Sequence, residues 1–114
     1  MKDIVSVFRP WLDTRPDVNI YHTDDAGWCC LTTLDDEPVL RSNLDRKTLL
    51  IVLTCLFFES VASRTWSGGV FQTIQEMQPY MDQLSQEDAE IIRSTLGLFL
   101  RFDEERFPRN TALS

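Results

Sequence analysis

The run from Leu49 to Phe58 is apolar at every position except Thr54. It is far shorter than the ~20 residues that a membrane-spanning helix needs. Its apolar side chains would point in every direction around a helix axis, and a helix that is apolar all round is a buried one. We therefore expect a central helix over residues 44–63, with the rest of the chain packed on most of its sides. Ser42 with Asp45 resembles a capping box at its start, and Asn43 is an alternative cap.

Helical periodicity recurs in three further segments. Residues 3–12 place their apolar side chains on one side of a helix that Asp3 can cap. A second stripe follows the loop at 65–69, and Pro79 is expected to kink or split its helix. Ser85 can cap a last helix, in which Gly97 is expected to allow a close helix contact.

The segment between the first two helices has a different pattern. Val18 and Ile20 alternate with polar residues, and residues 28–34 are rich in β-favouring types. Residues 23–27 join them as a turn that ends in Gly27, and Pro38 is expected to end the β structure. The sequence thus predicts a mainly α fold of about four helices around the central helix, with a small β-hairpin over 17–34 inserted after the first helix. Residues 1–108 are expected to form one domain, followed by a tail at 109–114.

The acidic residues are concentrated in two blocks. The net charge is −7. Residues 13–40 hold Arg15 as their one base, and residues 65–92 hold no base. The first block contains Asp13, Asp17, Asp24, Asp25, Asp35, Asp36 and Glu37, and the second contains Glu76, Asp82, Glu87, Asp88 and Glu90. Such a charge argues against nucleic-acid binding, which needs clustered Lys and Arg, and against docking on anionic membranes.

Catalytic and metal-binding arrangements are weak in this sequence. His22, Cys29, Cys30 and Cys55 are the His and Cys residues. They lack zinc-ligand spacing, although His22 could face Cys29 across the hairpin. The acidic pairs fall in predicted turns, where water keeps carboxyl groups ionised. Ser67-Gly68-Gly69 has no lysine after it, so it is no phosphate loop. We therefore expect no catalytic residue, no metal, no cofactor and no enzymatic activity.

The remaining hypothesis is a binding surface. Its alternative is a solvated acidic face without a specific role. Trp and Tyr anchor interfaces, and acids around them steer a cationic partner. The candidate partner-binding residues are Asp24, Asp25, Trp28, Asp35, Asp36, Glu37 and Trp66. An odd number of cysteines and an N-terminus unlike a signal peptide are typical of a cytoplasmic protein.

A short, acidic, mostly helical chain with acids around Asp24-Asp25, Asp35-Asp36-Glu37 and Glu87-Asp88-Glu90 resembles a small bacterial immunity protein of the contact-dependent growth inhibition type. The resemblance implies that the chain binds a cognate basic toxin, a nuclease domain, and blocks its active site or its access to nucleic acid.

Three other classes stay open. One is a small acidic inhibitor or adaptor of a host or phage enzyme. Another is a helical subunit that forms a homodimer through an apolar stripe of Phe71, Met77, Tyr80 and Met81, which would then be exposed. The third is an enzyme with a deep pocket that holds His22 and a cysteine.

Overall fold

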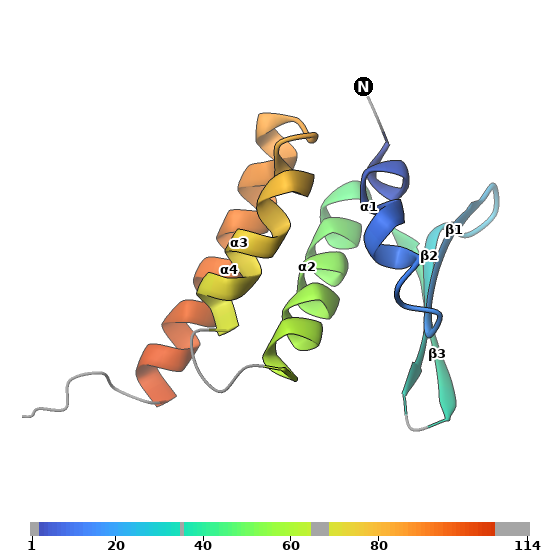
Figure 1. The fold of residues 1–114 in the computed structure, drawn as a ribbon. Helices are drawn as coiled ribbons and strands as arrows, with labels where there is room; N and C mark the ends of the chain where they lie inside the picture. Colours follow the sequence, from blue (N-terminus) through green and yellow to red (C-terminus); the bar gives the residue numbers. More distant parts are fainter. Residues whose placement is uncertain (1–2, 35, 65–68, 107–114) are drawn as a thin grey trace, which may run out of the picture.

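The computed structural model describes residues 3–34, 36–64 and 69–106. Within this part the order is α1 (Ile4–Leu12), β1 (Val18–Thr23), β2 (Gly27–Leu34), β3 (Glu37–Leu44), α2 (Arg46–Ala62), α3 (Gly69–Met81) and α4 (Gln86–Arg106). The strands form one antiparallel sheet in the order β1-β2-β3. The helices lie on one side of this sheet, with α2 between the sheet and the α3–α4 pair (Figure 1).

The expected mainly α fold with a small hairpin over 17–34 is wrong, because the sheet is a meander with a third strand. β1 and β2 do pair antiparallel across the expected turn, and Gly27 takes the left-handed φ of +61° that this turn requires. β3 then pairs along β2, from Leu34 opposite Glu37 to Trp28 opposite Leu44. The β structure therefore continues past Pro38.

Pro38 does not end the β structure because it lies on an edge strand. Its Cα partner on β2 is Thr33, and its other side faces the open edge of the sheet. A proline has no N–H to donate, so it is tolerated where the backbone nitrogen points away from the neighbouring strand. β3 also lacks an alternating buried face, since residues 37–43 are all exposed. The period-2 pattern that reveals a half-buried strand is therefore absent from it.

A β-bulge lies near the C-terminal end of β3, shortly before α2 begins. The register shifts between Trp28 and Cys30, and Asn43 takes a left-handed φ of 56°. The Asn43 N–H donates to the Ala26 carbonyl at 2.7 Å, which ties the bulge to the β1–β2 turn. The cap of α2 is consequently Asp45, whose carboxylate accepts from the Thr48 N–H at 2.7 Å. The expected caps Ser42 and Asn43 are wrong, because both belong to β3 and its bulge.

The apolar run lies at the centre of the molecule as expected. Leu49, Leu50, Leu53, Thr54 and Phe57 are buried. The remaining residues of the run are half-buried, so no side chain between 49 and 58 is exposed. The hydroxyl of Thr54 donates to the Leu50 carbonyl at 2.7 Å, which satisfies the one polar side chain inside the run.

Aromatic rings fasten the other helices to α2. Phe57 stacks on Trp11 of α1 at 4.8 Å between centroids and meets Tyr80 of α3 edge-on at 5.8 Å. Phe8 of α1 closes the group by stacking on Tyr80 at 5.1 Å. On another side of α2, Phe58 stacks on Phe99 of α4 at 4.7 Å. Adjacent residues of α2 thus hold different helices, which a helix apolar on one face alone would not allow.

The outer helices have the predicted N-caps, but the predictions at Pro79 and Gly97 in their interiors differ from the structure. Asp3 accepts from the Ser6 N–H at 2.9 Å, and Ser85 accepts from the Asp88 N–H at 3.2 Å, so both predicted caps are confirmed. α3 runs through Pro79 without a break. Gly97 is exposed, and a Cβ added there would meet nothing within 4 Å, so the expected close helix contact is wrong.

We predict that Leu53→Ala lowers the free energy of unfolding by about 2–5 kcal/mol, because Leu53 is fully buried in α2 and the variant leaves a cavity. Phe71→Ala is the control, since the Phe71 side chain is 49% exposed and its loss should cost under about 1 kcal/mol. Urea denaturation followed by circular dichroism measures both values. Equal losses would contradict the central position of α2.

Candidate functional site

The acids of the first block lie at the two ends of the sheet. Asp24 and Asp25 are in the turn between β1 and β2, and Asp36 and Glu37 are where β2 turns into β3. These turns are at opposite ends of β2, about 23 Å apart at ~3.3 Å per residue (Figure 1). The structure therefore separates carboxylates that the sequence places in one block. Asp35 lies outside the described residues.

The described acids at the ends of the sheet form no salt bridge, whereas several acids on the helices are paired with arginines. Asp24, Asp25, Asp36 and Glu37 are exposed, and none forms a salt bridge within the described part of the chain. The salt bridges that do form are Arg9–Asp13, Arg15–Asp17, Arg46–Asp88, Arg64–Glu76 and Arg93–Glu90. The fold thus neutralises much of the second block and leaves the sheet negative.

The strongest of these ion pairs joins the N-terminal ends of α2 and α4. The Asp88 side chain is 5% exposed, and its carboxylate accepts hydrogen bonds from Arg46 Nε and Nη2 at 2.5–3.2 Å. These hydrogen bonds hold the pKa of Asp88 below its ordinary value of 3.8, against the opposing effect of burial, and Ser85 adds a smaller lowering. Asp88 is therefore a structural residue of the helix pair rather than part of an exposed acidic surface.

Trp28 faces the helices. It pairs with His22 on β1 and Leu44 on β3, and residues paired across strands share a face of the sheet. Its half-buried ring packs against the core and meets the His22 ring edge-on at 5.1 Å. Trp28 is therefore on the inner face of the sheet, near the Asp24–Asp25 turn. Trp66 lies outside the described residues.

The outer face of the sheet carries apolar side chains with no helix over them. Tyr21 on β1 and Leu31 on β2 are half-buried, and Leu40 on β3, opposite Leu31, is 56% exposed. We call Tyr21, Leu31 and Leu40 the outer-face patch. The sequence pattern does not reveal this patch, because Leu40 belongs to β3, a strand that the pattern does not predict.

The backbone of β3 is also open at this edge. Pro38 cannot form a hydrogen-bonded pair with Thr33, so this pair is of the non-hydrogen-bonded kind. Such pairs alternate along an antiparallel ladder, and the pair two residues on is Leu40 with Leu31. The N–H and C=O of Leu40 therefore point away from β2 to the open edge.

The cysteines and His22 do not form a joint site. His22 shares the inner face with Trp28, whereas Cys29 pairs with Tyr21 on the outer face, so His22 does not face Cys29. The buried Cys29 thiol lies 3.7 Å from each of the Ala26 and Gly27 carbonyls. Burial raises the pKa values of the Cys30 and Cys55 thiols, which disfavours thiolates. Within the described ranges no three His, Cys, Asp or Glu side chains are placed to hold a metal ion.

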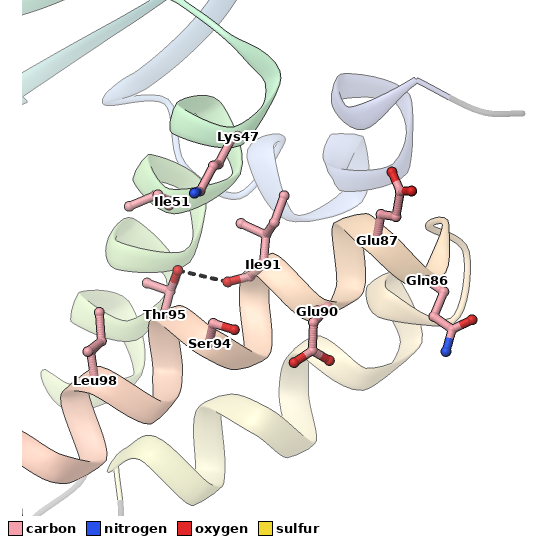
Figure 2. A pocket seen from close by; sticks show the side chains of 9 residues that line it. All are labelled: Lys47, Ile51, Gln86, Glu87, Glu90, Ile91, Ser94, Thr95 and Leu98. Carbon is pink, nitrogen blue, oxygen red and sulfur yellow. Dashed lines mark hydrogen bonds between the residues drawn. The ribbon is translucent and has the colours of Figure 1, made fainter.

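A groove of about 860 Å³ lies between α2 and α4. Ile51 of α2 and Ile91, Thr95 and Leu98 of α4 form its apolar part (Figure 2). Its other lining residues are Lys47, Gln86, Glu87, Glu90 and Ser94. No feature of the sequence predicts this groove, because its lining residues have the same spacing as residues that pack one helix against another.

The expected dimer stripe on α3 is mostly buried. Met77 and Met81 are 0% and 3% exposed, and Tyr80 belongs to the aromatic group around Phe57. Phe71 is the exposed member. This stripe therefore packs inside the chain and offers no continuous contact surface.

No protein-family model, curated protein or solved structure matches this chain. Across the described residues, none of the helices combines the length and apolarity needed to cross a membrane.

We predict that Asp88→Asn lowers the free energy of unfolding by about 1–3 kcal/mol at pH 7, because it removes charge-assisted hydrogen bonds from Arg46. A carboxyl whose folded pKa is lowered stabilises the fold above its ordinary pKa and loses that effect as the pH falls through the lowered value. The gap between wild type and variant should therefore be constant above about pH 5 and shrink below about pH 4. Urea denaturation from pH 7 to pH 2.5 measures the gap, and one that stays constant throughout would refute the assignment.

Proposed function

We propose that this chain is an immunity protein that binds a cognate cationic toxin, a nuclease domain, and neutralises it. The observation that supports this is the sheet, whose two turns carry free carboxylates and whose outer face carries an uncovered apolar patch between those turns. Protein interfaces commonly have this arrangement, with an apolar centre and a polar rim.

The free carboxylates would guide the approach of the partner. Asp24 and Asp25 at one end and Asp36 and Glu37 at the other carry charge that no base of the described chain neutralises. A nuclease presents Lys and Arg to hold phosphates. Opposite potentials raise the association rate by about 10–1,000-fold at low salt. The ~23 Å between the two ends suits a partner with a broad basic surface.

The outer-face patch would hold the partner once it has arrived. Leu40 and Tyr21 offer apolar and aromatic surface that binding can remove from water, and such central contacts dominate the dissociation rate. This moves the expected anchor from Trp28, whose ring already packs against the core, to the other face of the sheet.

Neutralisation would then need no chemistry. A toxin whose basic surface is covered by the sheet has no room there for nucleic acid, so occlusion alone blocks it. We propose accordingly that the chain is not an enzyme, uses no cofactor and acts in the cytoplasm, where a nuclease toxin meets its nucleic acid.

Charge steering can be tested with a candidate toxin encoded by the adjacent gene. We predict that Asp24→Lys with Asp25→Lys, and separately Asp36→Lys with Glu37→Lys, lower the rate at which this chain associates with that toxin. The rate should fall at least about tenfold at low salt and less at high salt. Stopped-flow binding at two salt concentrations measures this. Glu59→Lys with Asp82→Lys is the matched control, since it makes the same charge change at exposed positions on α2 and just after α3. If all three variants lowered the association rate equally, the effect would come from the net charge of the chain and not from the acids at the ends of the sheet.

A separate change tests the apolar patch. We predict that Leu40→Asp raises the dissociation rate at least about tenfold and leaves the association rate within about threefold, because it removes contact area from the centre of the interface. Val39→Asp is the control, since Val39 pairs with Thr32 and so lies on the inner face of the same strand. Loss of growth protection against the toxin should follow the Leu40 variant. An unchanged dissociation rate would exclude the outer face as the docking surface.

A further inference from the structure

One stripe on the solvent-facing side of α4 has charges at its ends and apolar or small residues between them, and the exposed Glu90–Arg93 ion pair lies beside it. Residues spaced by three or four positions form this stripe, which we call the α4 stripe: Glu87, Ile91, Ser94, Leu98 and Arg101. Leu98 is 62% exposed, the highest value among the exposed large hydrophobic residues. A purely solvated face would place charged residues at such positions.

The described residues of the chain leave this stripe uncovered. The groove beside it exposes the flank of Ile91 and Leu98 toward Ile51 (Figure 2). Next to the stripe, a Cβ added at Gly97 would meet no described atom within 4 Å outside the adjacent residues and backbone of its own helix. Among the side chains that the structure describes, which on α4 extend to residue 101, none forms a salt bridge with Glu87 or Arg101. Apolar surface, a groove and two opposite charges therefore occur together on one helix face.

We propose that the α4 stripe binds the same stripe of a second copy of this chain, antiparallel, around a two-fold axis at Ser94. Glu87 and Arg101 are each seven residues from Ser94, which is about 10 Å along a helix. An antiparallel partner therefore brings its Arg101 opposite Glu87, and the symmetry repeats this ion pair at the other end.

The same symmetry fills the groove. Leu98 follows Ser94 by four residues and Ile91 precedes it by three, on the same flank of α4. The two-fold axis places Leu98 of the second copy near Ile91, in the groove beside Ile51. Ser94 and Gly97 are small, so the two helices can approach closely at the centre.

The charge pattern favours a second copy over other helices. A uniformly basic helix would meet Arg101 at one end, and a uniformly acidic helix would meet Glu87 and Glu90 at the other. A helix whose contacting stripe carries opposite charges at its two ends, laid antiparallel, satisfies both, and the α4 stripe of a second copy does so with Glu87 and Arg101. The net charge of −7 on each copy opposes association, so screening by salt should favour the dimer.

This surface is separate from the one proposed for the toxin. The sheet and α4 lie on opposite sides of α2 (Figure 1). The dimer therefore leaves the outer-face patch open, and neither proposal depends on the other.

Sedimentation equilibrium over a concentration series, at about 0.15 M and about 0.5 M NaCl, tests the proposal. The wild type should form a dimer that is tighter at the higher salt. Glu87→Arg and Arg101→Glu should each weaken it at least about tenfold, since each variant replaces two attractions by two repulsions. The combination of both changes should restore the dimer to within about threefold, because the pair is then only reversed. A wild type that stays monomeric at both salt concentrations up to about 1 mM, or a combined variant as weak as the single ones, overturns the proposal.

A second pair of variants tests the apolar part. Leu98→Glu should abolish the dimer with an unchanged thermal midpoint of the monomer, because the side chain is already exposed. Phe71→Glu, an exposed residue of α3, should leave the dimer intact. A Leu98→Glu protein that dimerises like the wild type overturns the assignment to the α4 stripe.

Discussion

The burial of α2 dictates how the other elements are arranged. A helix that is apolar on all sides cannot lie on a surface, so other elements must cover several of its faces. The sheet with α1 covers one side, and α3 with α4 covers another. Phe57 and Phe58, adjacent in sequence, stack on different helices and so fix both groups to one axis. The two outer surfaces of the molecule, the open sheet face and the α4 stripe, are separated because α2 stands between them.

Charge is distributed along the same division. On the helices, acids serve the fold: Asp88 holds Arg46, Glu76 holds Arg64, and Asp3 and Asp45 cap helices. On the sheet, Asp24, Asp25, Asp36 and Glu37 have no such duty. A carboxylate that is already bound by an arginine offers little to a partner, since its field is largely cancelled at short range. Unpaired carboxylates that can meet a cationic toxin are therefore clustered at the ends of the sheet, whereas, among the described residues, most acids of the second block are paired and Glu87 of the α4 stripe is not.

Sequence reasoning succeeded where the signal is local. The caps at Asp3 and Ser85, the left-handed turn at Gly27 and the burial of the run at 49–58 each depend on residues within a few positions of one another. It failed at β3, whose eight residues show no alternation because neither face is buried and whose Pro38 resembles a terminator. It also failed at the cap of α2, because Asn43 belongs to a bulge that exists only when β3 pairs with β2.

The buried central helix, the pairing of β1 with β2 and the strong negative charge follow from the amino-acid sequence alone, because hydrophobic pattern, turn chemistry and formal charge are properties of neighbouring residues. Which face each element presents depends on long-range contacts. Strand pairing turned Trp28 inward and Leu40 outward and placed neighbouring acids at opposite ends of β2, and the packing of α4 on α2 left Leu98 exposed beside a groove. Those outcomes depend on contacts between distant segments, and no local period in the sequence records them.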